Sequence, residues 1–271
     1  MVRAALKFLG TVAAIYLIMI AGLYFFQRSL IYHPSSGTPP PERVGLPEME
    51  QVRIKTEDGL SLLAWWRAPS GPRKPVITLF HGNAGTIGYR GFKVRPLLNR
   101  GFGVLLLAYR GFSGNEGSPT EQGLFADARA TKKFLDEKKI SNDRRVLYGE
   151  SLGTGVAVYL ASLGHAGAVI LEAPYTSITD VAAARFPIFP VRSLVKDEFD
   201  SLSRIRSVRV PLLVIHGERD NVVAARFGKR LFAAANEPKE AEFIRNAGHI
   251  NLYNFGAANR VINFIRKHLN L

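Results

Sequence analysis

The chain of 271 residues contains no cysteine. This absence excludes disulfide bonds, thiolate metal sites and cysteine nucleophiles, although it does not distinguish an oxidising compartment from a reducing one. Acidic residues are scarce, since 22 Asp and Glu stand against 36 Lys and Arg and give a net charge of +14. Internal repeats and low-complexity segments are also lacking. The length and the 47% hydrophobic content suit one large α/β domain with a substantial core.

The positive charge is compatible with three partners or surfaces: nucleic acid, an anionic phospholipid surface, or solvent around a generally basic protein. Nucleic acid is disfavoured, because no known binding motif and no interleaving of aromatic and basic residues is present. A phospholipid surface fits better beside the apolar N-terminal segment described next. A plain basic surface explains the charge equally well.

Residues 8–26 (FLGTVAAIYLIMIAGLYFF) carry no charge. As a helix, this stretch would match the ~30 Å thickness of the hydrocarbon core of a bilayer. Arg3 and Lys7 precede it, and Arg28 follows aromatic residues typical of a membrane interface. A cleavable signal peptide is the alternative, but its apolar region would be shorter and would end at an A-x-A-like site. We therefore expect residues 1–30 to be an uncleaved signal-anchor, a single transmembrane helix.

The basic residues around this segment weakly favour a cytoplasmic N-terminus, with the rest of the chain on the extracytoplasmic (periplasmic) side. Residues 31–50 contain the run HPSSGTPPP. Such a composition predicts an extended, stiff linker that holds the body a short distance from the bilayer. The globular domain is expected to comprise residues 51–271.

Short apolar runs alternate with helical patterns in residues 51–271. A hairpin is predicted from 51–55 and 60–67 around the turn Glu57-Asp58-Gly59. Further strands are predicted at 75–80, 103–108, 145–148, 168–172, 211–216 and 242–244, and helices at 88–100, 121–139, 154–163, 224–235 and 256–269. Continuous apolar strands suit a parallel sheet buried on both faces. The alternation predicts an α/β fold with a mostly parallel, doubly wound sheet and helices on both faces.

The segment Gly149-Glu150-Ser151-Leu152-Gly153 follows one predicted strand and precedes a predicted helix. A G-x-S-x-G motif in this context places the serine on a sharp strand-to-helix turn, with its hydroxyl exposed above the sheet. Glycines are needed at both flanks because side chains there would clash with neighbouring elements. Ser151 is therefore the candidate nucleophile, and an ordinary glycine-rich turn is the alternative.

A serine hydroxyl needs a neighbouring base to accept its proton. Among six histidines, His249 is the candidate base, because it lies in the loop between the last predicted strand and the closing helix. His81 and His216 each end a strand but precede the acid in the chain. Asp220 follows the strand 211–216 and is the candidate acid, with Glu218 as its nearest competitor.

A tetrahedral intermediate also needs main-chain N–H donors for its oxyanion. One is expected from Leu152, directly after the nucleophile, and the second from the loop FHGNAG after an earlier strand, at Asn83. A plain glycine-rich turn is the alternative interpretation of that loop. Nothing in the sequence suggests a metal or an organic cofactor.

Several segments together carry a family resemblance: LFHGNAGTIGYR, AYRGFSGNEGSPTEQGLFADA, YGESLGTGVAV, LEAPYTSI, IHGERDNVV and NAGH. With them, residues 50–270 resemble the α/β-hydrolase superfamily, and more narrowly its membrane-anchored serine hydrolase branch with one N-terminal span. The resemblance implies a Ser151, Asp220, His249 triad and an oxyanion hole from Asn83 and Leu152. Members of this branch include esterases, acyl-protein thioesterases and lysophospholipase-like enzymes. Thr154, where relatives often carry glycine, is a small departure that leaves the mechanism intact.

The connection 173–210 is expected to form a small cap. Its apolar side chains Phe186, Ile188 and Phe189 either line an acyl pocket, face the bilayer, or pack the connection onto the sheet. An apolar cap beside a membrane segment favours a hydrolase of acyl esters or thioesters. A serine peptidase on the same fold and a non-catalytic, membrane-tethered binding protein are the alternatives.

Overall fold

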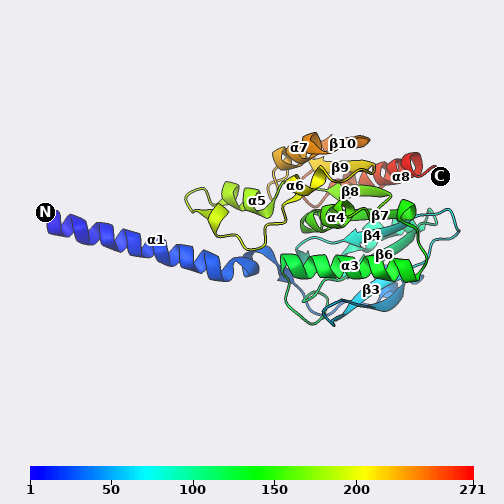
Figure 1. Cartoon of the computed structure of the whole chain (residues 1–271), viewed down its shortest axis with the longest axis horizontal. Helices are drawn as coiled ribbons and strands as arrows, with labels where there is room; N and C mark the ends of the chain where they lie inside the picture. The colour runs from blue at the N-terminus through cyan, green and yellow to red at the C-terminus, as the bar shows by residue number, and fades with distance from the viewer.

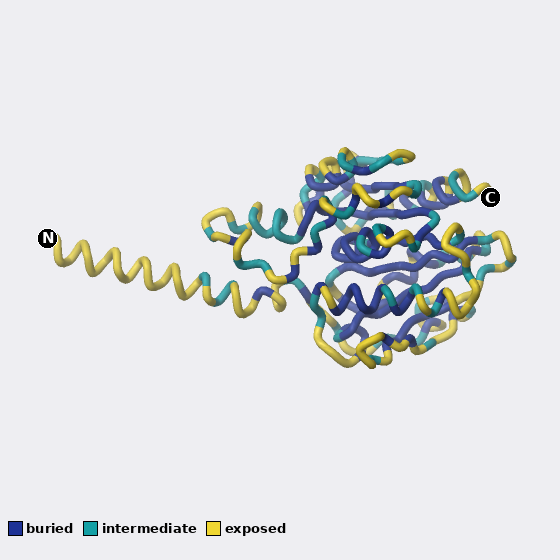
Figure 2. The backbone as a smooth tube through the Cα atoms, in the orientation of Figure 1, coloured by how far each residue is buried: buried dark blue, intermediate teal, exposed yellow.

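The chain divides into a protruding N-terminal helix and an α/β body, and the computed structural model describes both, residues 1–271 (Figure 1). Helix α1 (Val2–Ile31) has 30 residues, and Gln27 is its one buried residue. The rest of the helix is exposed or half-buried (Figure 2). By length and composition, α1 can cross a membrane.

An eight-stranded sheet forms the centre of the body, in the order β10-β9-β8-β7-β4-β6-β3-β2. The hairpin of β2 (Glu50–Lys55) and β3 (Ser61–Arg67) is antiparallel, β3 also runs antiparallel to β6, and every other pair is parallel. The parallel strands are β4 (Val76–Phe80), β6 (Gly103–Leu107), β7 (Arg145–Glu150), β8 (Ala168–Glu172), β9 (Leu212–Gly217) and β10 (Lys239–Ile244). The predicted doubly wound, mostly parallel sheet is confirmed.

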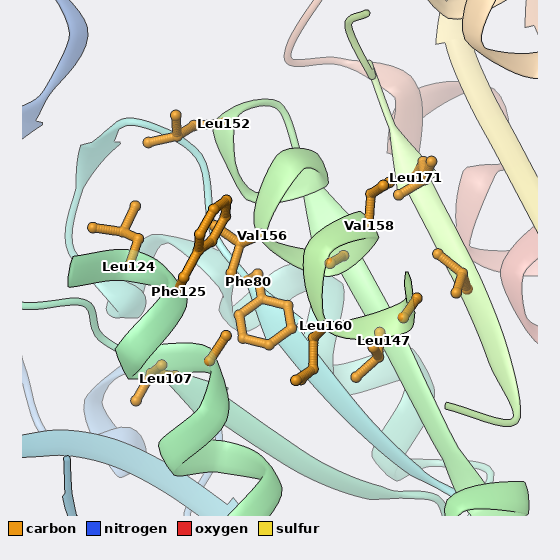
Figure 3. Close-up of a cluster of buried hydrophobic side chains, with 14 of the residues drawn as sticks. Phe80, Leu107, Leu124, Phe125, Leu147, Leu152, Val156, Val158, Leu160 and Leu171 are labelled. Atoms are coloured by element: carbon orange, nitrogen blue, oxygen red, sulfur yellow. The ribbon is translucent and has the colours of Figure 1, made fainter. Parts of the chain in front are cut away.

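Helices cover both faces of this sheet and enclose two apolar cores. One face carries α3 (Glu121–Glu137), α4 (Leu152–Ser162), α6 (Ser201–Ile205) and α7 (Ala225–Ala234), and the other carries α2 (Gly91–Leu98) and α8 (Ala257–His268). Figure 3 shows the first core, where Phe80 and Leu107 of the sheet meet Phe125 of α3 and Val156 of α4. Short 3-10 helices, η2 (Ile87–Arg90), η3 (Asn142–Arg144) and η5 (Leu252–Phe255), complete the body.

The connection 173–210, the expected cap, contains α5 (Ile178–Arg185), the 3-10 helix η4 (Val191–Ser193) and α6. Ser177 caps the N-terminus of α5: its hydroxyl oxygen accepts the N–H of Asp180 at 2.9 Å, which satisfies one of the first free N–H groups of the helix. None of the residues of α5 is fully buried, but Ile178 and Val181 pack against the first core from partly buried positions. The cap projects from the body on the same side as α1 (Figure 1).

Residues 31–50 do not form the extended spacer that their prolines suggest. His33–Pro34 pairs as β1 in parallel with β5 (Ala84–Gly85), and Pro41–Val44 forms the 3-10 helix η1. Leu46 and Met49 are buried in the body. Pro41 opens its helix, where a missing N–H costs nothing. The β1–β5 pair and the buried side chains of Leu46 and Met49 therefore attach the end of α1 directly to the body.

Candidate active site

Ser151 lies on the turn between β7 and α4, with φ 50° and ψ −116°. A non-glycine residue in this region of φ and ψ stores strain, as expected for a serine at a sharp strand-to-helix turn. The two flanking glycines allow the turn. A Cβ atom at Gly149 would lie 2.5 Å from Cα of Thr154, and one at Gly153 would lie 2.0 Å from the carbonyl oxygen of Phe80. As expected from the sequence, a side chain at either glycine would clash with its neighbours. The neighbouring atoms belong to the main chain and cannot move aside, so only glycine fits at these two positions.

Three predicted residues meet in one chain of hydrogen bonds. Nε2 of His249 lies 2.9 Å from Oγ of Ser151, and Nδ1 of the same ring lies 2.7 Å from Oδ2 of Asp220. Asp220 follows β9 and His249 follows β10, so parallel strands deliver both side chains to the same edge of the sheet as Ser151. With a proton on Nδ1, the unprotonated Nε2 faces the serine hydroxyl.

Asp220 is held as a carboxylate. Its Oδ1 accepts the N–H groups of Val222 and Val223 at 2.9 and 2.8 Å. Burial alone would raise the pKa of Asp220, but hydrogen bonds with His216 and His249 outweigh it and hold that pKa well below its usual range. The negative charge is therefore present whenever His249 needs a partner for its Nδ1 proton.

His216 is a neighbour of the site that the sequence motifs do not assign. Its Nε2 lies 3.2 Å from Oδ2 of Asp220 and 2.8 Å from the carbonyl oxygen of Val223, so it faces the acid and not Ser151. The ring fits because residue 228 is glycine: a Cβ there would lie 2.3 Å from Nδ1 of His216. The sequence does show His216 in a His-Gly pair at the end of β9. From the sequence alone, however, His216 could only be considered as an alternative to His249 for the general base.

The two expected oxyanion donors lie on the wall of the same cavity as Ser151. Leu152 opens α4, where the first N–H groups have no acceptor within the helix. The carbonyl of Asn83 accepts the N–H of His33 at 2.8 Å, and its side-chain amide donates to the carbonyl of Ile31 at 2.8 Å. Both contacts leave the main-chain N–H of Asn83 uncommitted. The end of α1 thus holds the loop that carries Asn83.

An apolar cavity of about 240 Å³ opens beside Ser151, and 14 of its 18 lining residues are hydrophobic. The cap contributes one wall, with Val181, Phe186 and Leu194, and α1 contributes another, with Leu23 and Leu30. Space for an acyl group therefore lies between the cap and the N-terminal helix. The contribution of α1 could not be foreseen, because its apolar residues read equally well as lipid-facing.

Ile188 and Phe189, predicted with Phe186 as pocket residues, do not line the cavity. They contact α1 instead. The hydroxyl of Tyr16 donates to the carbonyl of Ile188 at 2.7 Å, and the rings of Tyr16 and Phe189 stack with centroids 5.5 Å apart. The apolar run needed a partner to cover it, and that partner is the N-terminal helix rather than the pocket.

A polar clamp fastens the last turns of α1 to the cap; we use this name for Gln27 and Arg28 together with residues 194–197. The amide of Gln27 donates to the carbonyl of Leu194 at 3.0 Å and accepts the N–H of Lys196 at 2.7 Å. Nε of Arg28 lies 2.9 Å from Oδ2 of Asp197. These contacts explain why a glutamine is buried in an otherwise apolar helix.

A buried ion network lies beneath the serine turn. Nζ of Lys93 lies 2.7 Å from Glu172 and 3.3 Å from Glu150, and Nε of Arg90 lies 3.1 Å from Glu150. Burial alone would raise the pKa of Glu150, but the charges of Lys93 and Arg90 lower it below its usual range. Two cations and two anions thus balance next to Ser151. No group of three or more His, Asp or Glu side chains in the structure is arranged to hold a metal ion.

Comparison with known proteins identifies the family of this chain. The alpha/beta hydrolase family matches residues 79–200. The uncharacterized protein Rv2307c of Mycobacterium tuberculosis (strain ATCC 25618 / H37Rv) is 41% identical over 244 residues, which cover 88% of this chain and 87% of the relative. The chain belongs to the α/β-hydrolase family. The resemblance seen in the sequence motifs is therefore confirmed.

Two further relatives of this α/β hydrolase extend the comparison. The uncharacterized membrane protein YNL320W of Saccharomyces cerevisiae is 33% identical over 244 residues, 85% of this chain and 84% of that protein. The solved structure of the Pyrococcus furiosus esterase Pf2001 superposes with a TM-score of 0.72 at 24% identity, covering 88% of this chain and 99% of that one. At this identity the esterase structure establishes the shared fold.

Proposed function

We propose that this α/β hydrolase is a serine hydrolase that cleaves carboxylic esters or thioesters of acyl, lipid-like substrates. The observation that carries the proposal is the continuous chain from Ser151 through His249 to Asp220, with contacts of 2.9 and 2.7 Å, beside an apolar cavity. Such a chain activates a hydroxyl that is otherwise a weak nucleophile. The similarity to an esterase structure supports the same class of reaction.

In the first half of the reaction, Oγ of Ser151 attacks the substrate carbonyl carbon while Nε2 of His249 accepts the hydroxyl proton. The negative charge that develops on the carbonyl oxygen accepts hydrogen bonds from the N–H groups of Asn83 and Leu152. His249 then gives its proton to the leaving alcohol or thiol. The carbon–oxygen or carbon–sulfur bond breaks and leaves an acyl group on Ser151.

In the second half, water attacks the acyl carbon and His249 accepts a proton from that water. The bond to Oγ breaks, the proton returns to Ser151, and a fatty acid leaves. Asp220 keeps the imidazole in the required tautomer in both halves and stabilises the imidazolium that forms in between. The lowered pKa of Asp220 suits this role, because the residue must stay ionised throughout.

Helix α1 is proposed to anchor the enzyme as a single transmembrane span. The basic surface, with a net charge of +14, would add attraction to anionic lipid headgroups. The catalytic body is proposed to lie on the extracytoplasmic side, following the weak bias of basic residues around α1. Similarity to a protein described as a membrane protein supports the anchor.

The test is hydrolysis of nitrophenyl esters from acetate to palmitate by the detergent-solubilised full chain, beside Ser151→Ala. Removing such a nucleophile costs about 10⁶-fold in turnover. We expect Ser151-dependent activity that rises with acyl length until the cavity is full. Folded protein that hydrolyses no ester would refute the proposal and favour a peptidase or a non-catalytic protein. Activity that persists in Ser151→Ala would exclude Ser151 as the nucleophile.

A further inference from the structure

The cap tip, residues 186–190, has an apolar surface that continues the apolar surface of α1. Ile188 at this tip is 70% exposed, although it is a large aliphatic side chain. We propose that the cap tip is inserted in the bilayer beside α1, and that the acyl chain of a membrane lipid ester enters the cavity sideways from the bilayer, between the cap and α1. The proposed insertion of the cap tip is argued from the structure and from the membrane anchor α1. The proposed entry of the acyl chain also rests on the proposed function.

The depth of the cap tip follows from its contact with Tyr16. Tyr16 precedes Phe26, at the end of the uncharged stretch, by ten residues. At 1.5 Å per residue this is about 15 Å along the helix, half of the ~30 Å hydrocarbon core. Because Ile188 and Phe189 contact Tyr16, a membrane that contains α1 also surrounds the cap tip.

Irregular backbone is tolerated in hydrocarbon only when its polar groups find partners within the protein. Most of the cap tip meets this condition, because Pro187 and Pro190 carry no N–H and the carbonyl of Ile188 is bonded to Tyr16; the carbonyl of Pro187 accepts no hydrogen bond within the protein. Within residues 186–191, the N–H of Ile188 alone has no protein acceptor. The remaining donors are satisfied locally, with Phe186 bonded to Ala182 at 2.8 Å, Phe189 to Phe186 at 3.2 Å and Val191 to Phe189 at 2.8 Å.

Basic side chains flank the cap tip in the sequence and accompany the end of α1, and these are the side chains that could reach the lipid headgroups. Arg28 and Arg192 pair with acids at 2.9 Å but keep exposed side chains, 49% and 68% respectively. Arg185 lies on the cavity wall, and Nζ of Lys196 lies 3.9 Å from the ring centroid of Tyr24. Long basic side chains reach from apolar surroundings to the lipid phosphates, and interfacial aromatic residues accompany them. The apolar cap tip matches the hydrocarbon of a phospholipid leaflet, and the basic side chains match its phosphate headgroups.

The catalytic serine sits at a depth suited to lipid esters. Ile31 and Ser151 line the same cavity, and Ile31 lies five residues beyond Phe26. Five residues correspond to about 8 Å, which is the thickness of one interfacial layer between hydrocarbon and water. A substrate whose chain stays in the leaflet therefore presents its ester group near Ser151 without leaving the membrane.

Because the chain contains no cysteine, a single introduced cysteine can carry a fluorophore that reports whether the cap tip lies in the bilayer. Ile188→Cys gives the full chain a single thiol for an environment-sensitive fluorophore, and Leu163→Cys is the control. Leu163 is 47% exposed just after the C-terminal end of α4, far from the serine turn. In vesicles of neutral and anionic phospholipid, we expect blue-shifted emission at 188 that lipids spin-labelled in mid-chain quench. Position 163 should be quenched by iodide instead. Iodide quenching at 188 without lipid quenching would overturn the insertion.

Delivery of substrate is tested by Ile188→Asp, because a carboxylate is costly in hydrocarbon and the residue does not line the cavity. We expect hydrolysis of nitrophenyl palmitate embedded in vesicles to fall by about tenfold or more, with water-soluble nitrophenyl acetate unchanged. Leu163→Asp should change neither rate. Equal rates on vesicles for Ile188→Asp and the parent would overturn the entry route. A parent that hydrolyses neither ester would instead contradict the proposed function, while the fluorescence result would stand.

Discussion

The side-chain amide of Asn83 donates a hydrogen bond to the main-chain carbonyl of Ile31, with 2.8 Å between nitrogen and oxygen. One residue is an expected oxyanion donor, and the other is the last residue of α1. The N–H of His33 returns a bond to the carbonyl of Asn83, so the loop is held from both sides. The end of α1 and the residue that follows it therefore hold the loop that carries one of the two proposed oxyanion donors.

Asn83→Ala keeps the main-chain N–H but removes the bond to Ile31. We expect kcat to fall by about 10- to 100-fold, less than the 10²- to 10³-fold loss of a whole oxyanion donor, with little change in KM. Steady-state kinetics on nitrophenyl butyrate measure this. The control is Asn142→Ala, which removes a comparable amide bond, at 3.3 Å to Gly164, away from the site. Equal effects of both variants would contradict the positioning role.

Two truncations should separate anchoring from positioning. Deleting residues 1–22 removes most of the apolar span but keeps Gln27 and Arg28 in the polar clamp. Deleting residues 1–32 also removes the bond from the Asn83 amide to Ile31 and one wall of the cavity. We expect the first variant to hydrolyse nitrophenyl acetate in detergent nearly as the full chain does, and the second to lose most of this activity. Retained activity in the second variant, with an unchanged far-UV spectrum, would show that α1 only anchors.

Asp220→Asn should leave the fold intact and reduce kcat by about 10⁴-fold, because the amide favours the wrong imidazole tautomer of His249. Turnover of nitrophenyl butyrate measures this, with Asp180→Asn as a control, since Asp180 lies on α5 and pairs with Arg192. An Asp220→Asn variant with more than a tenth of the parent activity would exclude Asp220 as the acid.

Lys93→Met removes one cation from the buried network and leaves Glu172 without its partner at 2.7 Å. Breaking such a buried pair costs about 3–5 kcal/mol of the free energy of unfolding. Urea denaturation should show this loss. Lys132→Met is the matched control, since Lys132 pairs with Asp136 at 2.7 Å on the surface and should cost at most about 1 kcal/mol. Similar losses for the two variants would show that the network contributes nothing beyond a surface pair.

Acid should destabilise the protein through Asp220. Its folded-state pKa is below the unfolded value, so the folded state binds its proton less readily. The stabilisation is therefore complete above the ordinary carboxyl pKa near 4 and is lost as pH falls below it. We expect the free energy of unfolding to decrease from pH 5 to pH 3, and to decrease less steeply in Asp220→Asn. Parallel curves for parent and variant would contradict this linkage.

Local pattern was sufficient for much of the site. The turn at Ser151 can be predicted from five consecutive residues between a strand and a helix. The order Ser, Asp, His along the chain then indicates Asp220 as the acid and His249 as the base. The pairing of Gly228 with His216 and the network of Lys93 with Glu172 could not be predicted in this way. Each joins residues that are distant in sequence, and nothing in their local patterns indicates which side chains share a buried space.

The N-terminal region shows the opposite limitation. Its helix was predictable from residues 8–26 alone, yet two of its partners were misassigned. Proline content predicts an extended, stiff linker in residues 31–50, although Leu46 and Met49 are buried. The pocket was one of three surroundings predicted for Ile188 and Phe189, and contact with α1 was not among the three. Periodicity shows that a surface is apolar, but it does not show what covers it.

The polar clamp around Gln27 has one more consequence. A body joined to its anchor by a slack tether would tumble and sample substrates at many heights above the membrane. Here the bonds of Gln27 and the Arg28–Asp197 pair join the end of α1 to the cap at several points. If α1 is the proposed anchor, these contacts would hold Ser151 at one distance from the bilayer centre. The proposed hydrolase would then select substrates by the distance of their scissile bond from that centre, and membranes of different thickness would offer it different substrates.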